Sequence, residues 1–97
     1  MYELKYLPSA DFDIIEAEEY LYEHSPPAVD KLTEAIKKQT ANLVDYPLMY
    51  PVYDKKPYFR VMPLPYEYLC FYHVDENNHV VEIHRILRGM RDVVNTL

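Results

Sequence analysis

The side chains best suited to chemistry in this sequence are its four arginines, and all of them lie in the second half of the chain. They are Arg60, Arg85, Arg88 and Arg91. A guanidinium group presents a planar fork of N–H donors that matches the oxygens of a phosphate or a carboxylate. The pattern therefore indicates recognition of a polyanion or an acidic partner, in a chain whose net charge is −6.

Groups able to transfer a proton accompany these arginines in the segment HVVEIHRILRGMRD. Glu82 and His84 are two residues apart, so they share one face of a strand, and Arg88 lies further along that face. Metal-free cleavage of RNA needs a base, cations at the phosphate and an acid for the leaving oxygen. We therefore take Arg60, His84, Arg88 and Arg91 as the candidate catalytic residues. The alternative is structural: Glu82 pairs with a nearby arginine and His84 is a partly buried spacer.

A second use of the cations needs no catalysis. Lys55 and Lys56 precede the arginines, and Arg88 and Arg91 form a basic C-terminal region. An acidic segment of a partner protein could lie along these four side chains, which are the candidate partner-binding residues. Residues 51–97 hold six acids and six bases, whereas residues 1–50 hold ten acids and four lysines. This acidic half argues against a protein that binds nucleic acid over its whole surface.

Alternation along the last strand predicts which of its residues face the core. Val81, Ile83, Arg85 and Leu87 share the more apolar face, which we expect to pack against helices. We expect Arg85, on this face, to pair with a helix acid such as Glu16 rather than to act in catalysis. The opposite face is expected to stay uncovered and to gather cations for a ligand.

Metal and cofactor sites are not indicated. Cys70 and His73 are three residues apart, and His79 and His84 are five apart, so each pair points to opposite faces of a strand. Neither spacing is that of a metal site. The single glycine rules out a glycine-rich phosphate loop. We predict no cofactor and no metal, and Cys70 is typical of a small core residue.

The elements that must position these residues follow the order β-α-α-β-β-β. We predict strands over 2–7, 58–64, 66–75 and 79–88, a helix capped by Ser9 and ending near His24, a second helix capped by Ser25 and ending before Pro47, and a proline-rich loop over 46–57. The last residues, MRDVVNTL, add a short helix or strand. The predicted fold class is α+β: an antiparallel sheet with an N-terminal helical hairpin on one face.

Each predicted helix carries one apolar face. Its members recur at helical spacing and are Ala10, Ile14, Ala17 and Leu21 in the first helix, and Val29, Leu32, Ile36, Thr40 and Leu43 in the second. A four-residue connection, HSPP, predicts that the two helices are antiparallel neighbours.

Length and composition limit the class of protein. The 97 residues, 49% of them hydrophobic, suit a single domain over 1–97 with one core. One cysteine without a partner fits a reducing compartment, so we expect a cytoplasmic protein. We find no N-terminal targeting signal and no apolar run of membrane-spanning length, and expect no membrane partner.

Several segments, taken in order, resemble the RelE/ParE superfamily. They are YLPSADFDIIEAEEYL, NLVDYP, FRVMPLPYEYLCFYHVD and VVEIHRILRGMRD, which together span nearly the whole chain. Members of this superfamily are the toxins of type II toxin–antitoxin modules, also called plasmid stabilization proteins. The resemblance implies a small cytoplasmic toxin that inhibits growth and is neutralised by a cognate antitoxin.

The resemblance also implies two different activities. RelE-type members cut messenger RNA on the ribosome without a metal, whereas ParE-type members inhibit DNA gyrase. Arg60 stands where the family commonly has an arginine, and Arg91 with Asp92 matches a common terminal pair. The segment YLCFY has Leu69 where RelE-type enzymes place a catalytic arginine, which favours the ParE-like subset.

We therefore predict a toxin whose target is either gyrase or the ribosome and its messenger RNA. If it is RelE-like it is an endoribonuclease, and if ParE-like it is not an enzyme. A third hypothesis is a related binding protein that has lost toxicity.

Overall fold

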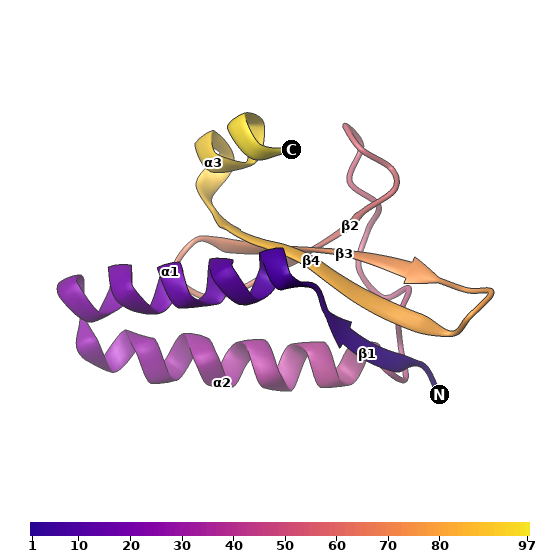
Figure 1. Cartoon of the computed structure of the whole chain (residues 1–97), viewed down its shortest axis with the longest axis horizontal. Helices are drawn as coiled ribbons and strands as arrows, with labels where there is room; N and C mark the ends of the chain where they lie inside the picture. The colour runs from indigo at the N-terminus through magenta and orange to yellow at the C-terminus, as the bar shows by residue number, and fades with distance from the viewer.

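The computed structural model describes residues 1–97, and its elements follow the predicted order with one further helix at the C-terminal end (Figure 1). The elements are β1 (Glu3–Tyr6), α1 (Pro8–His24), α2 (Pro26–Leu43), β2 (Arg60–Pro63), β3 (Tyr68–Asp75), β4 (Val80–Arg88) and α3 (Gly89–Thr96). The final segment is thus a helix. None of the three helices has both the length and the apolar character needed to cross a bilayer.

The four strands form one sheet in the order β1-β4-β3-β2. The pairs β2–β3 and β3–β4 are antiparallel, as predicted, but β1 runs parallel to β4. A parallel pair cannot be joined by a tight hairpin and needs a long connection. The connection between β1 and β4 contains the helical hairpin and the strands β2 and β3. The first strand of the chain therefore pairs with the last.

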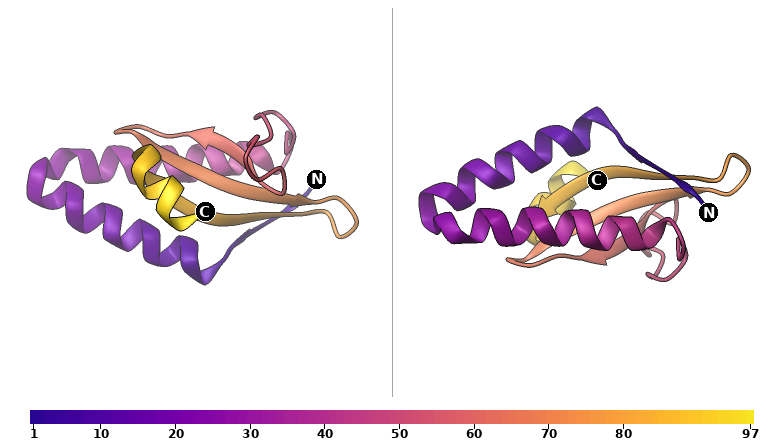
Figure 2. Two further views of the ribbon diagram at one scale, coloured as in Figure 1. Left: turned by 90° about the horizontal axis from the view of Figure 1, so that it is seen from above. Right: turned by 90° about the horizontal axis from the view of Figure 1, so that it is seen from below.

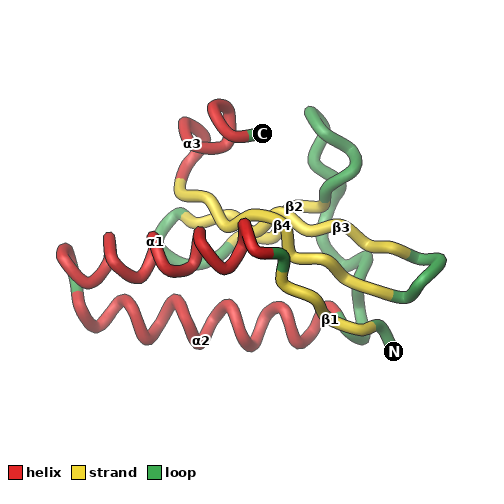
Figure 3. Tube along the Cα trace, in the orientation of Figure 1, coloured by secondary structure: helices red, strands yellow, loops and turns green.

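The helices lie on both sides of the sheet. α1 and α2 pack together below it in Figure 1, while α3 lies above it. The views in Figure 2 agree, since α3 crosses the sheet on the side away from α2. The loop before β2 rises on the same side as α3 (Figure 3). The predicted hairpin on one face is therefore present, with additional cover on the other.

The main core lies between the sheet and the helical hairpin. Leu32 and Ile36 of α2 pack with Cys70, Tyr72 and other strand residues in one buried cluster. The predicted helix faces are confirmed: Ala10, Ala17, Leu21, Leu32, Ile36, Thr40 and Leu43 are buried, and Ile14 and Val29 are half-buried at the margin.

The opposite face of the sheet is not bare, so the expectation of an uncovered face is wrong. Phe71, Leu87 and Val93 form a second buried cluster there, against which Tyr53 and Phe59 also pack. The physical cause is that β3 has apolar side chains on both of its faces. On this face they are covered by residues of α3 and of the loop before β2.

A bulge in β4 reverses the predicted alternation. Phe71 pairs with Arg85 but its neighbour Tyr72 pairs with Ile83, so His84 has no partner on β3. One extra residue moves every later side chain to the other face. Leu87 therefore joins the second cluster, and the prediction that it shares a face with Ile83 is wrong. Ile86, which we placed on the other face, is in the main core instead.

The two serines predicted to cap helices do not do so with their side chains. α1 begins two residues earlier than expected, at Pro8, with Leu7 rather than Ser9 at the N-cap position. The Ser9 hydroxyl donates instead to the backbone oxygen of His84 at 2.7 Å. Ser25 does occupy the N-cap position of α2, but its hydroxyl forms no capping hydrogen bond. Ser9 thus joins α1 to β4.

The serines supply a matched pair of substitutions. Ser9→Ala should lower the free energy of unfolding by about 1 kcal/mol, because it removes a partly buried hydrogen bond. Ser25→Ala should leave it within about 0.3 kcal/mol, because no side-chain bond is lost. Urea unfolding followed by circular dichroism measures both. Equal losses would contradict the assigned hydrogen bonds.

The buried thiol gives a second prediction. Cys70 has no exposed surface, and burial raises the pKa of its thiol to about 12. Because the thiolate is the reactive form, native protein at pH 8 should react with a disulfide reagent only as fast as it unfolds. Labelling that stays fast when unfolding is slowed by a stabilising osmolyte would show that Cys70 is accessible.

Candidate functional site

Past the point where β1 ends, the edge of β4 is hydrogen-bonded by the first residues of α1 and the residue before it. β1 pairs with β4 only as far as Ile83, whose oxygen accepts from the Leu7 backbone N–H at 3.0 Å. The Ser9 hydroxyl takes the next backbone oxygen, that of His84. The backbone N–H of Ile86 then donates to the Asp13 carboxylate at 2.9 Å. Side chains of α1 therefore continue the hydrogen bonding that a neighbouring strand would provide.

Asp13 also binds Arg85 through both of its oxygens. The Arg85 Nε lies 2.8 Å from one oxygen and the terminal nitrogen lies 2.9 Å from the other. Asp13 is 7% exposed, and the hydrogen bond to it raises the pKa of Arg85. A structural pairing of Arg85 with a helix acid was predicted and is present, but the partner is Asp13 rather than Glu16. Asp13 lies three residues earlier and faces the sheet.

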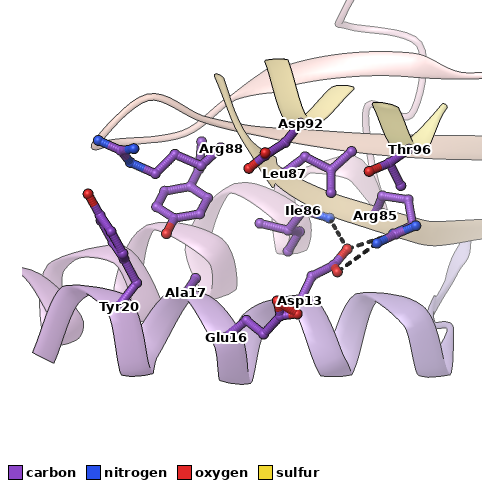
Figure 4. Close-up of a pocket in the computed structure, with 11 residues that line it drawn as sticks. Asp13, Glu16, Ala17, Tyr20, Arg85, Ile86, Leu87, Arg88, Asp92 and Thr96 are labelled. Carbon is purple, nitrogen blue, oxygen red and sulfur yellow. Dashed lines mark hydrogen bonds and ion pairs between the residues drawn. The ribbon is translucent and has the colours of Figure 1, made fainter. Parts of the chain in front are cut away.

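A cleft of about 420 Å³ opens beside this ion pair, between α1, the end of β4 and α3 (Figure 4). Its charged lining combines two cations with three acids, which are Arg85, Arg88, Asp13, Glu16 and Asp92. Tyr20 and Tyr68 supply aromatic walls, and burial raises the pKa of Tyr68. The Tyr68 hydroxyl is thus a neutral donor that can face a polar ligand group.

Arg88 stands at the rim of the cleft. Its guanidinium carbon lies 4.8 Å from the centre of the Tyr20 ring, and one nitrogen lies 3.5 Å from a Glu67 carboxylate oxygen. The Arg88 side chain is 40% exposed and Glu67 is 77% exposed, so this ion pair is weak. Arg88 can therefore exchange Glu67 for an acidic group of a partner.

His84 lies on the opposite face of the sheet, in an aromatic cluster. Its Nε2–H donates to the Glu82 carboxylate at 3.0 Å, and its ring meets the Phe59 ring edge-on. The His73 ring stacks on Tyr58 with centres 3.8 Å apart, and its Nδ1–H donates to the Tyr58 backbone oxygen. Glu82 pairs with His84 and with no arginine. A carboxylate–imidazole pair able to move a proton is therefore present.

The remaining predicted residues lie elsewhere. Arg60 donates to the backbone oxygen of Tyr50 at 2.7 Å and pairs along β2 with Tyr72, on the core side of the sheet. Arg91 is exposed on α3 and forms no ion pair. Lys55 and Lys56 are exposed in the loop before β2.

The structure does not bring Arg60, His84, Arg88 and Arg91 together. Arg88 contacts α1 on one face of the sheet, and His84 lies on the other face. Arg60 is held beneath the loop by Tyr50. Bases, cations and acids for phosphodiester cleavage must meet at one phosphate, and these four do not.

Two parts of the site were not found from the sequence. Asp13 was not among the predicted site residues, although it lies three residues after Ala10 and four before Ala17, on the apolar face. That spacing was the available signal for a buried carboxylate. Tyr20 beneath Arg88 had no comparable signal. No group of three or more histidine, cysteine or acidic side chains is placed to hold a metal ion.

Comparison with known proteins gives two findings. The model of the ParE toxin family, described as the toxin of the type II toxin–antitoxin system parDE, matches residues 4–93. A solved chain of the chromosomal ParDE TA system from P. aeruginosa is similar in fold, with a TM-score of 0.76 and 21% identity. That alignment covers 91% of this chain and 96% of the other. No curated protein matches the sequence.

The ion pair between Asp13 of α1 and Arg85 of β4 can be tested by comparing substitutions of Asp13 and of the nearby Glu16. Asp13→Ala should lower the free energy of unfolding by about 3 kcal/mol, because it leaves the Arg85 charge and the Ile86 N–H without a partner. Glu16→Ala, one turn away and exposed, should change it by less than about 0.5 kcal/mol. Chemical unfolding of both variants measures these changes. A larger loss of unfolding free energy for Glu16→Ala than for Asp13→Ala would contradict the pairing of Arg85 with Asp13.

Proposed function

Because the chain belongs to the family of ParE toxins of type II toxin–antitoxin systems, we propose that it inhibits growth until a cognate antitoxin binds it. The family match spans residues 4–93, and the fold is that of a ParDE chain from P. aeruginosa. The family description supports a protein antitoxin as a partner. Which cellular target the toxin acts on is the finer part of the proposal.

We infer that the toxin acts by binding DNA gyrase rather than by cutting messenger RNA. The observation that carries this inference is the dispersal of Arg60, His84, Arg88 and Arg91 over separate surfaces. The central strand adds support, since Leu69 replaces the arginine of RelE-type enzymes. A binding inhibitor needs exposed complementary groups but no convergence on a single phosphate.

The exposed cations suit such a binding role. Arg88 lies on the cleft rim with a weak, replaceable partner, and Arg91 projects from α3. Lys55 and Lys56 belong to the loop that rises on the same side of the sheet as α3 (Figure 3). These four side chains are the proposed contacts for an acidic surface, either of the target or of the antitoxin that displaces it.

A nuclease is the second candidate, and one observation favours it. Glu82 and His84 form a proton-transfer pair beside the stacked rings of Tyr58 and His73. Tyr58 is 56% exposed and could stack a base. No arginine lies in this cluster to stabilise the charge of a cleaved phosphate, so we rank it below gyrase inhibition.

Controlled induction in a bacterial host separates these functions. The gyrase proposal predicts growth arrest with loss of plasmid negative supercoiling while messenger RNA stays intact at early times. Arg88→Glu with Arg91→Glu should relieve the arrest, and Glu82→Gln with His84→Gln should not. Supercoiling gels and primer extension read the two outcomes.

Opposite results would identify the alternatives. Messenger cleavage abolished by Glu82→Gln and His84→Gln would establish the nuclease and reject gyrase inhibition. Unimpaired growth, with the protein shown to be folded and abundant, would reject both and indicate a binding protein without toxicity.

A further inference from the structure

The outer surface of α1 carries an unusual charge distribution. Its 17 residues include six acids and no lysine or arginine, as the segment PSADFDIIEAEEYLYEH shows. Only Asp13 among these acids is buried. Glu16 lines the cleft beside β4, and the other four border the hollows between α1 and α2; they are Asp11, Glu18, Glu19 and Glu23. The formal charge of α1 is therefore −6, equal to the net charge of the whole chain.

Large apolar side chains are exposed among these acids. Phe12 is 68% exposed, Ile15 is 53% exposed and Tyr22 is 63% exposed. Ile15 and Tyr22 are seven residues apart and lie on the same side of the helix, and Tyr22 lines a hollow between α1 and α2. Nothing in the chain covers them, although burying such side chains removes apolar surface from water.

The groove between α1 and α2 has two hollows on this outer surface. One, of about 620 Å³, lies near the hairpin turn and is lined by Glu18, Glu19, Tyr22, Glu23, Pro26, Val29 and Asp30. The other, of about 290 Å³, is lined by Tyr6, Asp11, Ile14, Thr33, Ile36 and Lys37. The Thr33 hydroxyl of the second hollow lies 3.3 Å from a carboxylate oxygen of Glu18, which lines the first. Both hollows have apolar lining residues; the first is bordered by four acids and no cation, and the second by one acid, Asp11, and one cation, Lys37.

We propose that the outer groove of the helical hairpin binds an amphipathic helix rich in lysine and arginine, supplied by a protein partner. Apolar side chains of that helix would occupy the two hollows and contact Ile15 and Tyr22. Its cations would reach the carboxylates that border the groove. α1 is about 25 Å long, so about 17 residues of partner helix would span it.

Charge complementarity selects this occupant over two others. A second copy of the chain would bring the same acidic α1 surface to the contact, and like charges oppose such pairing. An anionic membrane surface would be repelled for the same reason. The groove lies on the side of the sheet away from α3 (Figure 1 and Figure 2), so the proposal does not depend on the proposed function.

A model helix tests the site without knowledge of the natural partner. The probe is a fluorescein-labelled 17-residue peptide of leucine and lysine in amphipathic order, with a scrambled peptide of identical composition as control. Binding to the full chain should be at least about tenfold tighter for the ordered peptide. Amide chemical shifts should change in α1 and α2, around Val29 and Thr33.

Charge-matched variants locate the contact. Glu19→Lys with Asp30→Lys should weaken binding roughly tenfold, because two favourable pairs become repulsive. Glu3→Lys with Glu76→Lys makes the same change in net charge away from the groove and should weaken it by no more than about threefold. Ile15→Ser should weaken binding more than Val94→Ser, an exposed apolar residue of α3.

Three outcomes would overturn the proposal. Equal binding of ordered and scrambled peptides would reduce the attraction to net charge alone. Equal weakening by the two double variants would do the same. Chemical shifts confined to the sheet or α3 would place the peptide elsewhere.

Discussion

One buried carboxylate, that of Asp13, holds the helical hairpin against the sheet. It accepts the Ile86 backbone N–H and both arms of the Arg85 fork, at a point where β4 has no neighbouring strand. A buried carboxylate is stable only when its oxygens are occupied in this way. The position of α1, the cleft beside it and the outer groove between α1 and α2 all depend on this contact.

The same contact decides how the charges are divided. Arg85 is committed to Asp13 and Arg60 to a backbone oxygen, so two of the four arginines have structural partners. Arg88 and Arg91 remain for a partner, near α3, whereas four of the six acids of α1 border the groove toward α2. The chain therefore presents one cleft of mixed charge with Arg88 at its rim and one acidic, apolar groove. This division is consistent with the binding function proposed above.

Much of the fold could be predicted because its signals are local. The apolar spacing in α1 and α2 and the short hairpin connection predicted both helices and their packing. The bulge at His84 could not be predicted, since it depends on how β4 pairs with β3, and it moved Ile86 and Leu87 to unexpected faces. The dispersal of the arginines also depends on tertiary contacts: Arg60 donates to the Tyr50 oxygen of the preceding loop, and Arg88 lies over Tyr20, which is distant in sequence.

Hydrogen exchange at the Ile86 backbone amide tests the Asp13 contact most directly. This amide points away from β3 and has no donor role except toward the Asp13 carboxylate. The account predicts that it exchanges as slowly as the amides of β3 in the main core, because only global unfolding would release it. Exchange as fast as that of the exposed turn over 76–79 would contradict the account, since α1 would then not be held to the edge of β4.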